Sequence, residues 1–259
     1  MELTARASTA RVKLGADRMA KSIESSPAGS GFASDLKSSI SAWRDAPLMP
    51  LVAGLLAAFP ETLLYPVIGG LAQAIGIAVG LFTAGWVGSS LIWYRQLFEG
   101  NGSRPTDLIR LTSGFIARYF LLAFVLLLAS IILFFIYSFA GRLGSHSLDK
   151  PAGRIGLAVA IGAVFFAATF AYPALAYSTS NVIRAVQIAK KMLIKGWPGN
   201  WPYAVAPAAF TGISVGISWF LPPLALTGLR IVEALVALAF LGAIARYYLR
   251  SERRSAATL

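Results

Sequence analysis

Several residue types that protein chemistry commonly depends on are scarce in this chain. The 259-residue sequence has no cysteine and one histidine, and Asp, Glu, Lys and Arg together make up 13% of it. The lack of cysteine excludes disulfides, thiolate metal sites and cysteine nucleophiles. A lone histidine, His146, cannot supply the ligand clusters of a typical metal site. The sequence therefore predicts no enzyme, no cofactor and no metal site.

Long apolar runs take the place of the missing charge. Hydrophobic residues make up 57% of the chain and its mean hydropathy is +0.68, whereas charged residues alone are about a quarter of a soluble globular protein. About 20 apolar helical residues cross the hydrocarbon layer of a bilayer. By that measure we predict an all-α integral membrane protein with six transmembrane helices at about 47–66, 68–94, 115–141, 154–177, 203–222 and 225–248.

The first pair of runs leaves an alternative open. Pro60 and Glu61 interrupt the first run, and a tight turn near Gly69 and Gly70 joins it to the second. A re-entrant hairpin is therefore as compatible with these two runs as two full crossings, because non-helical backbone is tolerated at membrane depth where protein buries it.

The positive charges predict the orientation. With the N-terminus inside, all but four of the 23 Lys and Arg residues fall in inward segments, and the four outward ones are Arg142, Lys150, Arg154 and Arg230. Cytoplasmic loops carry such an excess, so both termini are expected in the cytoplasm of a prokaryotic cell, with the chain in its inner membrane. The net charge of +12 is then attributed to this bias and to anionic lipids rather than to nucleic acid.

The chain divides into residues 1–46, a transmembrane domain 47–248 and a cytoplasmic tail 249–259. Within the first segment we predict a partly disordered basic stretch and then an interfacial helix over 35–44. Ser34 is its expected N-cap, and Leu36, Ile40 and Trp43 form its apolar side. For residues 1–30 an entirely disordered tail is the alternative.

A second helix outside the membrane is predicted over 180–196, between spans four and five. Ser180 or Asn181 can cap its start and Gly196 its end. Its apolar stripe consists of Val182, Val186, Ala189 and Leu193, and its basic residues are Arg184, Lys190, Lys191 and Lys195. These basic residues are expected to contact anionic lipid or a cytoplasmic protein partner; a helix that only anchors the loop is the alternative.

Small residues at four-residue spacing mark two predicted helix contact faces. Such spacing lets helices approach closely in lipid. The ribbon of span two is Ala72, Gly76, Gly80, Ala84 and Gly88, and that of span five is Ala204, Ala208, Gly212 and Gly216. We expect both spans to be buried, packed against each other or within a homo-oligomer, and the Phe-rich third span to lie nearer lipid.

Few polar residues are expected at membrane depth. Glu61 and Gln73 are candidates for a polar pathway, because an unpaired ionisable group there is costly. Arg230 and Glu233, three residues apart, can form a local ion pair. The G-x-S-x-G at 212–216 sits in an apolar helical run, without the strand–turn–helix context that a hydrolase elbow needs.

Three short segments carry a resemblance. They are Trp93-Tyr94-Arg95, the loop over 98–102, and the basic helix from Arg184 to Lys195 followed by Gly196-Trp197. Over residues 35–248 the chain resembles uncharacterised prokaryotic six-span membrane proteins, similar to the membrane domain that precedes some glycerophosphodiester phosphodiesterases. The resemblance implies a six-helix membrane fold and brings no catalytic residues.

Together these patterns favour a non-enzymatic membrane subunit or scaffold that contacts a partner or anionic lipid through its basic cytoplasmic face. The alternative is a transporter or permease component with a polar pathway near spans one, two and five.

Overall fold

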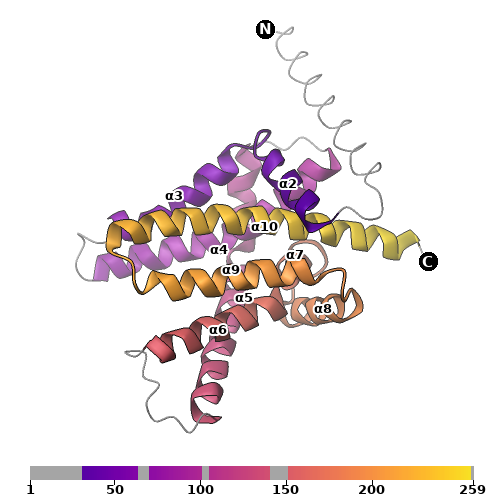
Figure 1. Cartoon of the computed structure of the whole chain (residues 1–259). Helices are drawn as coiled ribbons and strands as arrows, with labels where there is room; N and C mark the ends of the chain where they lie inside the picture. Colours follow the sequence, from indigo (N-terminus) through magenta and orange to yellow (C-terminus); the bar gives the residue numbers. More distant parts are fainter. Residues whose placement is uncertain (1–30, 64–69, 101–104, 141–150, 258–259) are drawn as a thin grey trace, which may run out of the picture.

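The computed structural model describes residues 31–63, 70–100, 105–140 and 151–257, and every regular element among them is a helix (Figure 1). In chain order the helices are α2 (Phe32–Ala42), α3 (Leu48–Leu63), α4 (Gly70–Glu99), α5 (Pro105–Ala140), α6 (Pro151–Ala168), α7 (Ala171–Tyr177), α8 (Val182–Lys195), α9 (Trp201–Ser218) and α10 (Pro223–Ala257).

Four helical stretches are long and apolar enough to cross a membrane. They are Ala74–Glu99, Arg110–Ile136, Gly153–Tyr177 and Leu224–Arg253, which match the predicted second, third, fourth and sixth spans. The apolar stretch of α3 is shorter, Leu48–Ala58, and α9 is not among the four. By helix length and composition the chain is a multi-pass membrane protein, while the count of six crossings stays a prediction.

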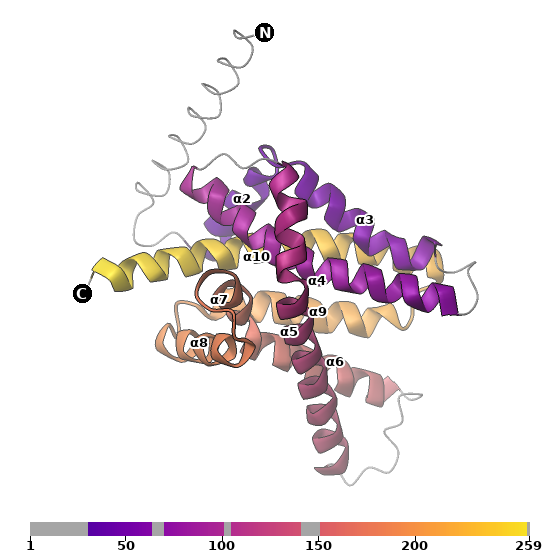
Figure 2. The same cartoon turned by 180° about the vertical axis from the view of Figure 1, so that it is seen from behind.

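The long helices do not all run in one direction. Figures 1 and 2 show α10 extending along the molecule beside α9, while α5 runs across them. Helix α5 packs on α4, α6 packs on α9, and α10 packs on α2 and α3. Phe120, Phe124 and Phe135 of α5 are about half exposed or more, whereas Phe134 is buried; that this helix lies nearer lipid stays a prediction.

One end of the molecule gathers segments that are far apart in the sequence. We call it the α8 end; it consists of α2, α7, α8, the last turns of α4 and α10, and the first turn of α9. The hydroxyl of Tyr177 donates to the carbonyl of Leu91 at 2.6 Å, and the hydroxyls of Ser178 and Tyr248 are 2.6 Å apart. Parts of all four segments predicted to face the cytoplasm therefore meet at one end.

Tyr94 of α4 ties α2 to α10 within this end. Its hydroxyl accepts hydrogen bonds from Ser39 Oγ at 3.1 Å and Trp43 Nε1 at 2.8 Å, and donates to the carbonyl of Leu238 at 3.1 Å. Gly242 makes this approach possible. A Cβ at that position would lie 2.0 Å from Ser39 Oγ, so any larger residue would displace the α2 helix or the tyrosine ring.

The bounds and the N-cap of α2 differ from the prediction. The helix spans 32–42 rather than 35–44, and Gly31 rather than Ser34 occupies the N-cap, without a side-chain cap bond. Packing extends it, because the Phe32 ring contacts the rings of Tyr203 and Phe240 at centroid distances of 5.1 and 6.0 Å. Its buried residues are Asp35, Ser39 and Ala42.

Candidate functional site

Helix α8 begins and ends where the sequence predicted. Asn181 is its N-cap, and the side-chain oxygen accepts a hydrogen bond from the backbone N–H of Arg184 at 3.1 Å. Gly196 is its C-cap, and Asn200 Nδ2 then donates to the carbonyls of Met192 at 2.6 Å and Leu193 at 3.3 Å. Both termini are satisfied by local side chains, so this helix has a defined length and position.

One face of α8 is buried and the opposite face is basic. Val182, Ala185 and Ala189 are buried, and they hold the helix against α7. The side chains that form what we call the α8 basic surface are all exposed: Arg184, Lys190, Lys191 and Lys195. None of these four has an acidic partner among the residues that the structure describes. The surface therefore presents positive charge that nothing within the described chain neutralises.

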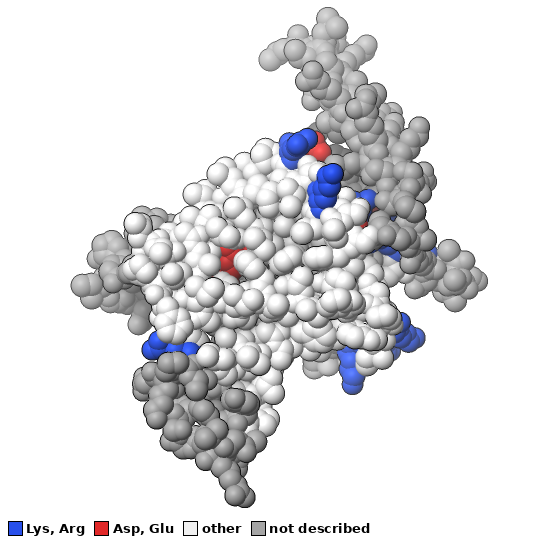
Figure 3. Space-filling view, viewed as in Figure 1, with Lys and Arg blue, Asp and Glu red and all other residues white. Residues whose placement is uncertain are grey.

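Large apolar side chains lie beside this basic surface. Ile183 is 72% exposed and Ile194 64%, and Trp197 in the following loop and Trp201 at the start of α9 are exposed as well. Figure 3 shows a broad face almost free of charged residues, with Lys and Arg confined to its margins. Exposed isoleucine and tryptophan next to lysine are typical of a helix that lies at a membrane interface.

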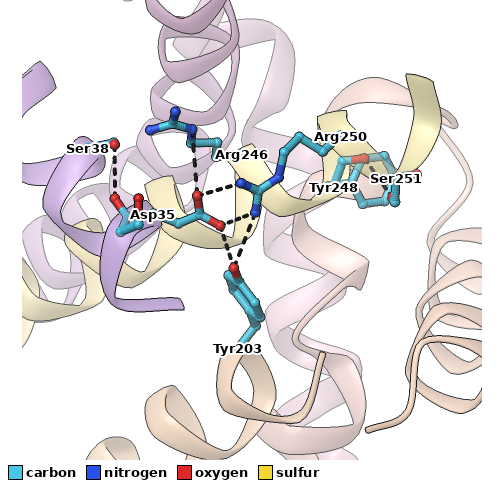
Figure 4. Close-up of polar contacts among 8 residues, drawn as sticks. Asp35, Ser38, Tyr203, Arg246, Tyr248, Arg250 and Ser251 are labelled. Atoms are coloured by element: carbon cyan, nitrogen blue, oxygen red, sulfur yellow. Dashed lines mark hydrogen bonds and ion pairs between the residues drawn. The ribbon is translucent and has the colours of Figure 1, made fainter. Parts of the chain in front are cut away.

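The α8 end is fastened by a buried carboxylate that the sequence analysis missed. Asp35 of α2 is fully buried, and it accepts hydrogen bonds from Arg250 of α10 and from the hydroxyl of Tyr203 of α9 (Figure 4). The Arg250 Nη1 to Asp35 Oδ1 distance is 2.9 Å, and Arg246 Nε lies 3.6 Å from the same oxygen. We call these four residues the Asp35 cluster.

The cluster balances two opposed effects on Asp35. Burial raises the pKa of its carboxyl above the usual value, whereas the Tyr203 hydroxyl and the two arginines favour the ionised form. A buried charge is tolerated when it is paired and hydrogen-bonded in this way. Its sequence signal was the pair Arg246 and Arg250, one turn apart at the end of the last apolar run, opposite an aspartate on a short N-terminal helix.

The predicted polar-pathway residues fall into two groups. The side chains of Glu61 and Gln73 lie outside the described residues. Arg230 and Glu233 form the predicted ion pair, with Nη1 and Oε2 2.8 Å apart and both side chains partly exposed. Since each neutralises the other on one helix face, this pair is explained by local structure alone.

The small residues of α9 pack against α6 rather than α4. A Cβ on Gly212 would lie 3.2 Å from the carbonyl oxygen of Ala158, and one on Gly162 would lie 3.1 Å from that of Ala208. Ala204 and Ala208 are buried, and a Cβ added to Gly216 would lie 3.9 Å from the Cβ of Ala158. The possibility that spans two and five pack against each other is therefore wrong within this chain, because Gly162 and Ala158 of α6 provide the close approach to α9.

The α4 ribbon is used only in part. A Cβ on Gly88 would lie 2.6 Å from the Phe115 ring, whereas one on Gly80 would meet nothing within 4 Å. Gly85 is outside the predicted ribbon, and a Cβ added to it would lie 2.5 Å from the carbonyl oxygen of Thr112. Gly76 and Ala84 are half-buried, and the side chain of Ala72 lies outside the described residues. Helix α4 thus contacts α5 through Gly88 of the predicted ribbon and through Gly85, which is not part of that ribbon.

No protein-family model matches the chain, and neither a curated protein nor a solved structure is similar enough to count as a match. The resemblance to six-span membrane proteins accordingly stays a prediction. The function has to be argued from the chain's own geometry.

Proposed function

We propose that this chain is a non-enzymatic multi-pass scaffold or subunit of the prokaryotic inner membrane, whose α8 basic surface binds anionic lipid headgroups on the cytoplasmic side. The observation that carries the proposal is the composition of the exposed face of α8. It combines four unpaired basic side chains with exposed isoleucine and tryptophan.

Lipid suits this face better than a protein groove does. Each Lys or Arg near an anionic bilayer surface contributes about 1 kcal/mol of attraction. Exposed Ile183 and Ile194 can enter the headgroup boundary while the lysine stems extend to phosphates. A soluble partner would leave Trp197 and Trp201 in contact with water unless it covered them as well.

The topology that goes with this proposal has six crossings and both termini in the cytoplasm. Two observations support it: the strong bias of Lys and Arg toward alternate segments, and the meeting of those segments at the α8 end. The Arg253 to Glu99 approach of 3.8 Å and the Asp35 cluster join three of them directly.

The test is native mass spectrometry of the full chain in mixed micelles of phosphatidylglycerol and phosphatidylcholine. We expect the chain to retain the anionic lipid preferentially, and the double variant Lys190→Gln/Lys191→Gln to lose about thirtyfold of that preference, in line with about 1 kcal/mol for each of the two charges. Lys190→Arg/Lys191→Arg is the matched control, because it keeps both charges. Equal retention of the two lipids by the unmodified chain would contradict the proposal.

Two other results would point elsewhere. A soluble protein that co-purifies with the unmodified chain but not with the Gln variant would favour a partner-docking role for the same surface. Movement of a solute across liposomes by the purified chain would favour the transporter alternative.

A further inference from the structure

A cavity of about 300 Å³ lies between the helices, away from the α8 basic surface. Helices α3, α4, α6, α7, α9 and α10 all contribute to its wall, and most of its lining is apolar, as at Ala57, Val87, Phe165, Phe210, Ala237 and Leu241. No charged side chain is among the described residues that line it. Its size is at the lower end of the range of small-molecule sites, about 300–1,000 Å³.

Two buried polar side chains in this wall have no hydrogen-bond partner among the described residues. Trp86 is 6% exposed and Ser90 fully buried, and neither the Trp86 Nε1 nor the Ser90 Oγ has a partner. They are four residues apart on α4 and therefore lie on one face of the helix. Other polar side chains of α4 nearby do have hydrogen-bond partners. Ser89 Oγ lies 3.0 Å from Thr112 Oγ1, and Thr83 Oγ1 donates to the Val79 carbonyl at 2.8 Å.

Unpaired buried polar groups are rare, and they call for an explanation. In a membrane they are costlier still, because lipid offers no hydrogen bond in return. Two such groups a single turn apart, both in the wall of one cavity, are explained together if a bound molecule supplies the missing partner.

The chemistry of the wall specifies the ligand. A dry apolar cavity of about 150 Å³ binds benzene, so twice that volume suits a molecule with about two rings or a short acyl chain. A charged ligand would find no counter-charge in the wall. The indole N–H can only donate and a serine hydroxyl can donate as well, so the ligand must present an acceptor oxygen.

We propose that this cavity binds a neutral, mainly apolar molecule bearing a carbonyl oxygen, which accepts hydrogen bonds from Trp86 Nε1 and Ser90 Oγ. Ring ketones and quinones on one hand and acyl esters on the other share this chemistry. The site is independent of the α8 basic surface and does not rest on its function.

The experiment measures binding of paired probes to the full chain in detergent by isothermal titration. The ring ketone 9-fluorenone is compared with fluorene, and the acyl ester methyl octanoate with nonane, so that each carbonyl probe has a carbonyl-free match. We expect at least one carbonyl probe to bind about tenfold more tightly than its match, as one or two buried hydrogen bonds provide. The pair that shows the difference identifies the source, ring or acyl chain.

Four variants locate the effect. Trp86→Phe keeps the ring and removes the N–H, and Ser90→Ala removes the hydroxyl; each should lower the tenfold preference to about threefold or less. Trp93→Phe and Ser214→Ala are the matched controls, since Trp93 and Ser214 are equally buried but do not line the cavity, and both should keep the preference.

Three results would overturn the proposal. They are an absence of binding by all four probes, equal binding within both pairs, and an undiminished preference in both Trp86→Phe and Ser90→Ala. Circular dichroism and gel filtration establish that each variant is folded, and because Ser90→Ala is nearly isosteric, it keeps the test decisive if Trp86→Phe does not fold.

Discussion

The α8 end and the cavity region differ in the hydrogen bonds that their buried polar groups make. At the α8 end, Asp35 contacts Tyr203, Arg246 and Arg250, and the hydroxyl of Tyr94 joins three groups on two other helices. In the cavity wall, Trp86 and Ser90 lack partners within the described chain. Hydrogen-bonded polar groups fix helix positions, whereas unpaired ones leave a site incomplete. Two buried atoms at the α8 end, Arg246 Nε and Asn200 Oδ1, also lack a hydrogen-bond partner among the residues that the structure describes, although Arg246 is ion-paired with Asp35. The α8 end therefore holds helices together, whereas the cavity region has room for a bound molecule.

The largest effect should come from breaking the Asp35 cluster. Asp35→Ala removes the shared acceptor of Tyr203 and Arg250 and the counter-charge of buried Arg246, and loss of one partner of a buried ion pair costs about 3–5 kcal/mol. Unfolding in detergent, followed by circular dichroism against denaturant or temperature, measures the loss. Asp45→Ala is the control, because Asp45 is exposed and should change stability by about 0.5 kcal/mol or less. Equal stability of the two variants would show that the cluster does not hold α2.

The next effect concerns close packing at Gly242. Its Cβ would lie 2.0 Å from Ser39 Oγ and 2.6 Å from the Tyr94 ring, so Gly242→Ala should destabilise the protein by about 1–3 kcal/mol through overpacking. Gly80→Ala meets nothing within 4 Å and should be neutral or slightly stabilising, since Ala favours helix by about 0.5–1 kcal/mol over Gly. The same unfolding assay compares them, and a neutral Gly242→Ala would contradict the described approach of α2 to α10.

A matched pair of serines tests the contrast itself. Ser39 and Ser90 are both fully buried, but Ser39 donates to Tyr94 and Ser90 has no partner. Without ligand, Ser39→Ala should cost about 1 kcal/mol, and Ser90→Ala should cost nothing or stabilise by a few tenths, because it removes an unsatisfied group. Equal losses in both variants would mean that Ser90 has a partner in the ligand-free protein.

The smallest effect is expected at the Arg230–Glu233 pair. Both side chains are partly exposed, and a helical pair at this spacing contributes about 0.2–0.5 kcal/mol. Glu233→Gln should therefore lower the unfolding free energy by no more than that amount. A loss comparable with that of Asp35→Ala would give this pair a role beyond local pairing.

Local signals in the sequence were more informative than long-range ones. Asn181 and Gly196 predicted both ends of α8, because a helix cap depends on residues within one turn. The apolar runs likewise predicted the four long helices. The partner of a small-residue ribbon could not be predicted: Gly212 meets Ala158 of α6 because their backbones approach closely, and spacing alone does not name the opposite helix.

The buried side of α2 shows the same limit for polar residues. Leu36, Ile40 and Trp43 indicated the apolar side of an interfacial helix, and Ile40 is 47% exposed, but no local pattern indicated that Asp35 is fully buried. Burial of Asp35 depends on two arginines more than 200 positions away. The cavity could not be predicted from the sequence either. It is the space that six helices leave unfilled, and its volume depends on how all six pack together.

The bond between Asp35 and Arg250 has a consequence for biosynthesis. The two residues are 215 positions apart, so the carboxylate enters the nascent chain long before its counter-charge. At translation rates of about 5–20 residues per second it waits roughly 10–40 s. Helix α2 can contact Tyr94 of α4 earlier, but the charge of Asp35 is neutralised only after the last helix has been made, and a chain that ends before Arg246 never neutralises it.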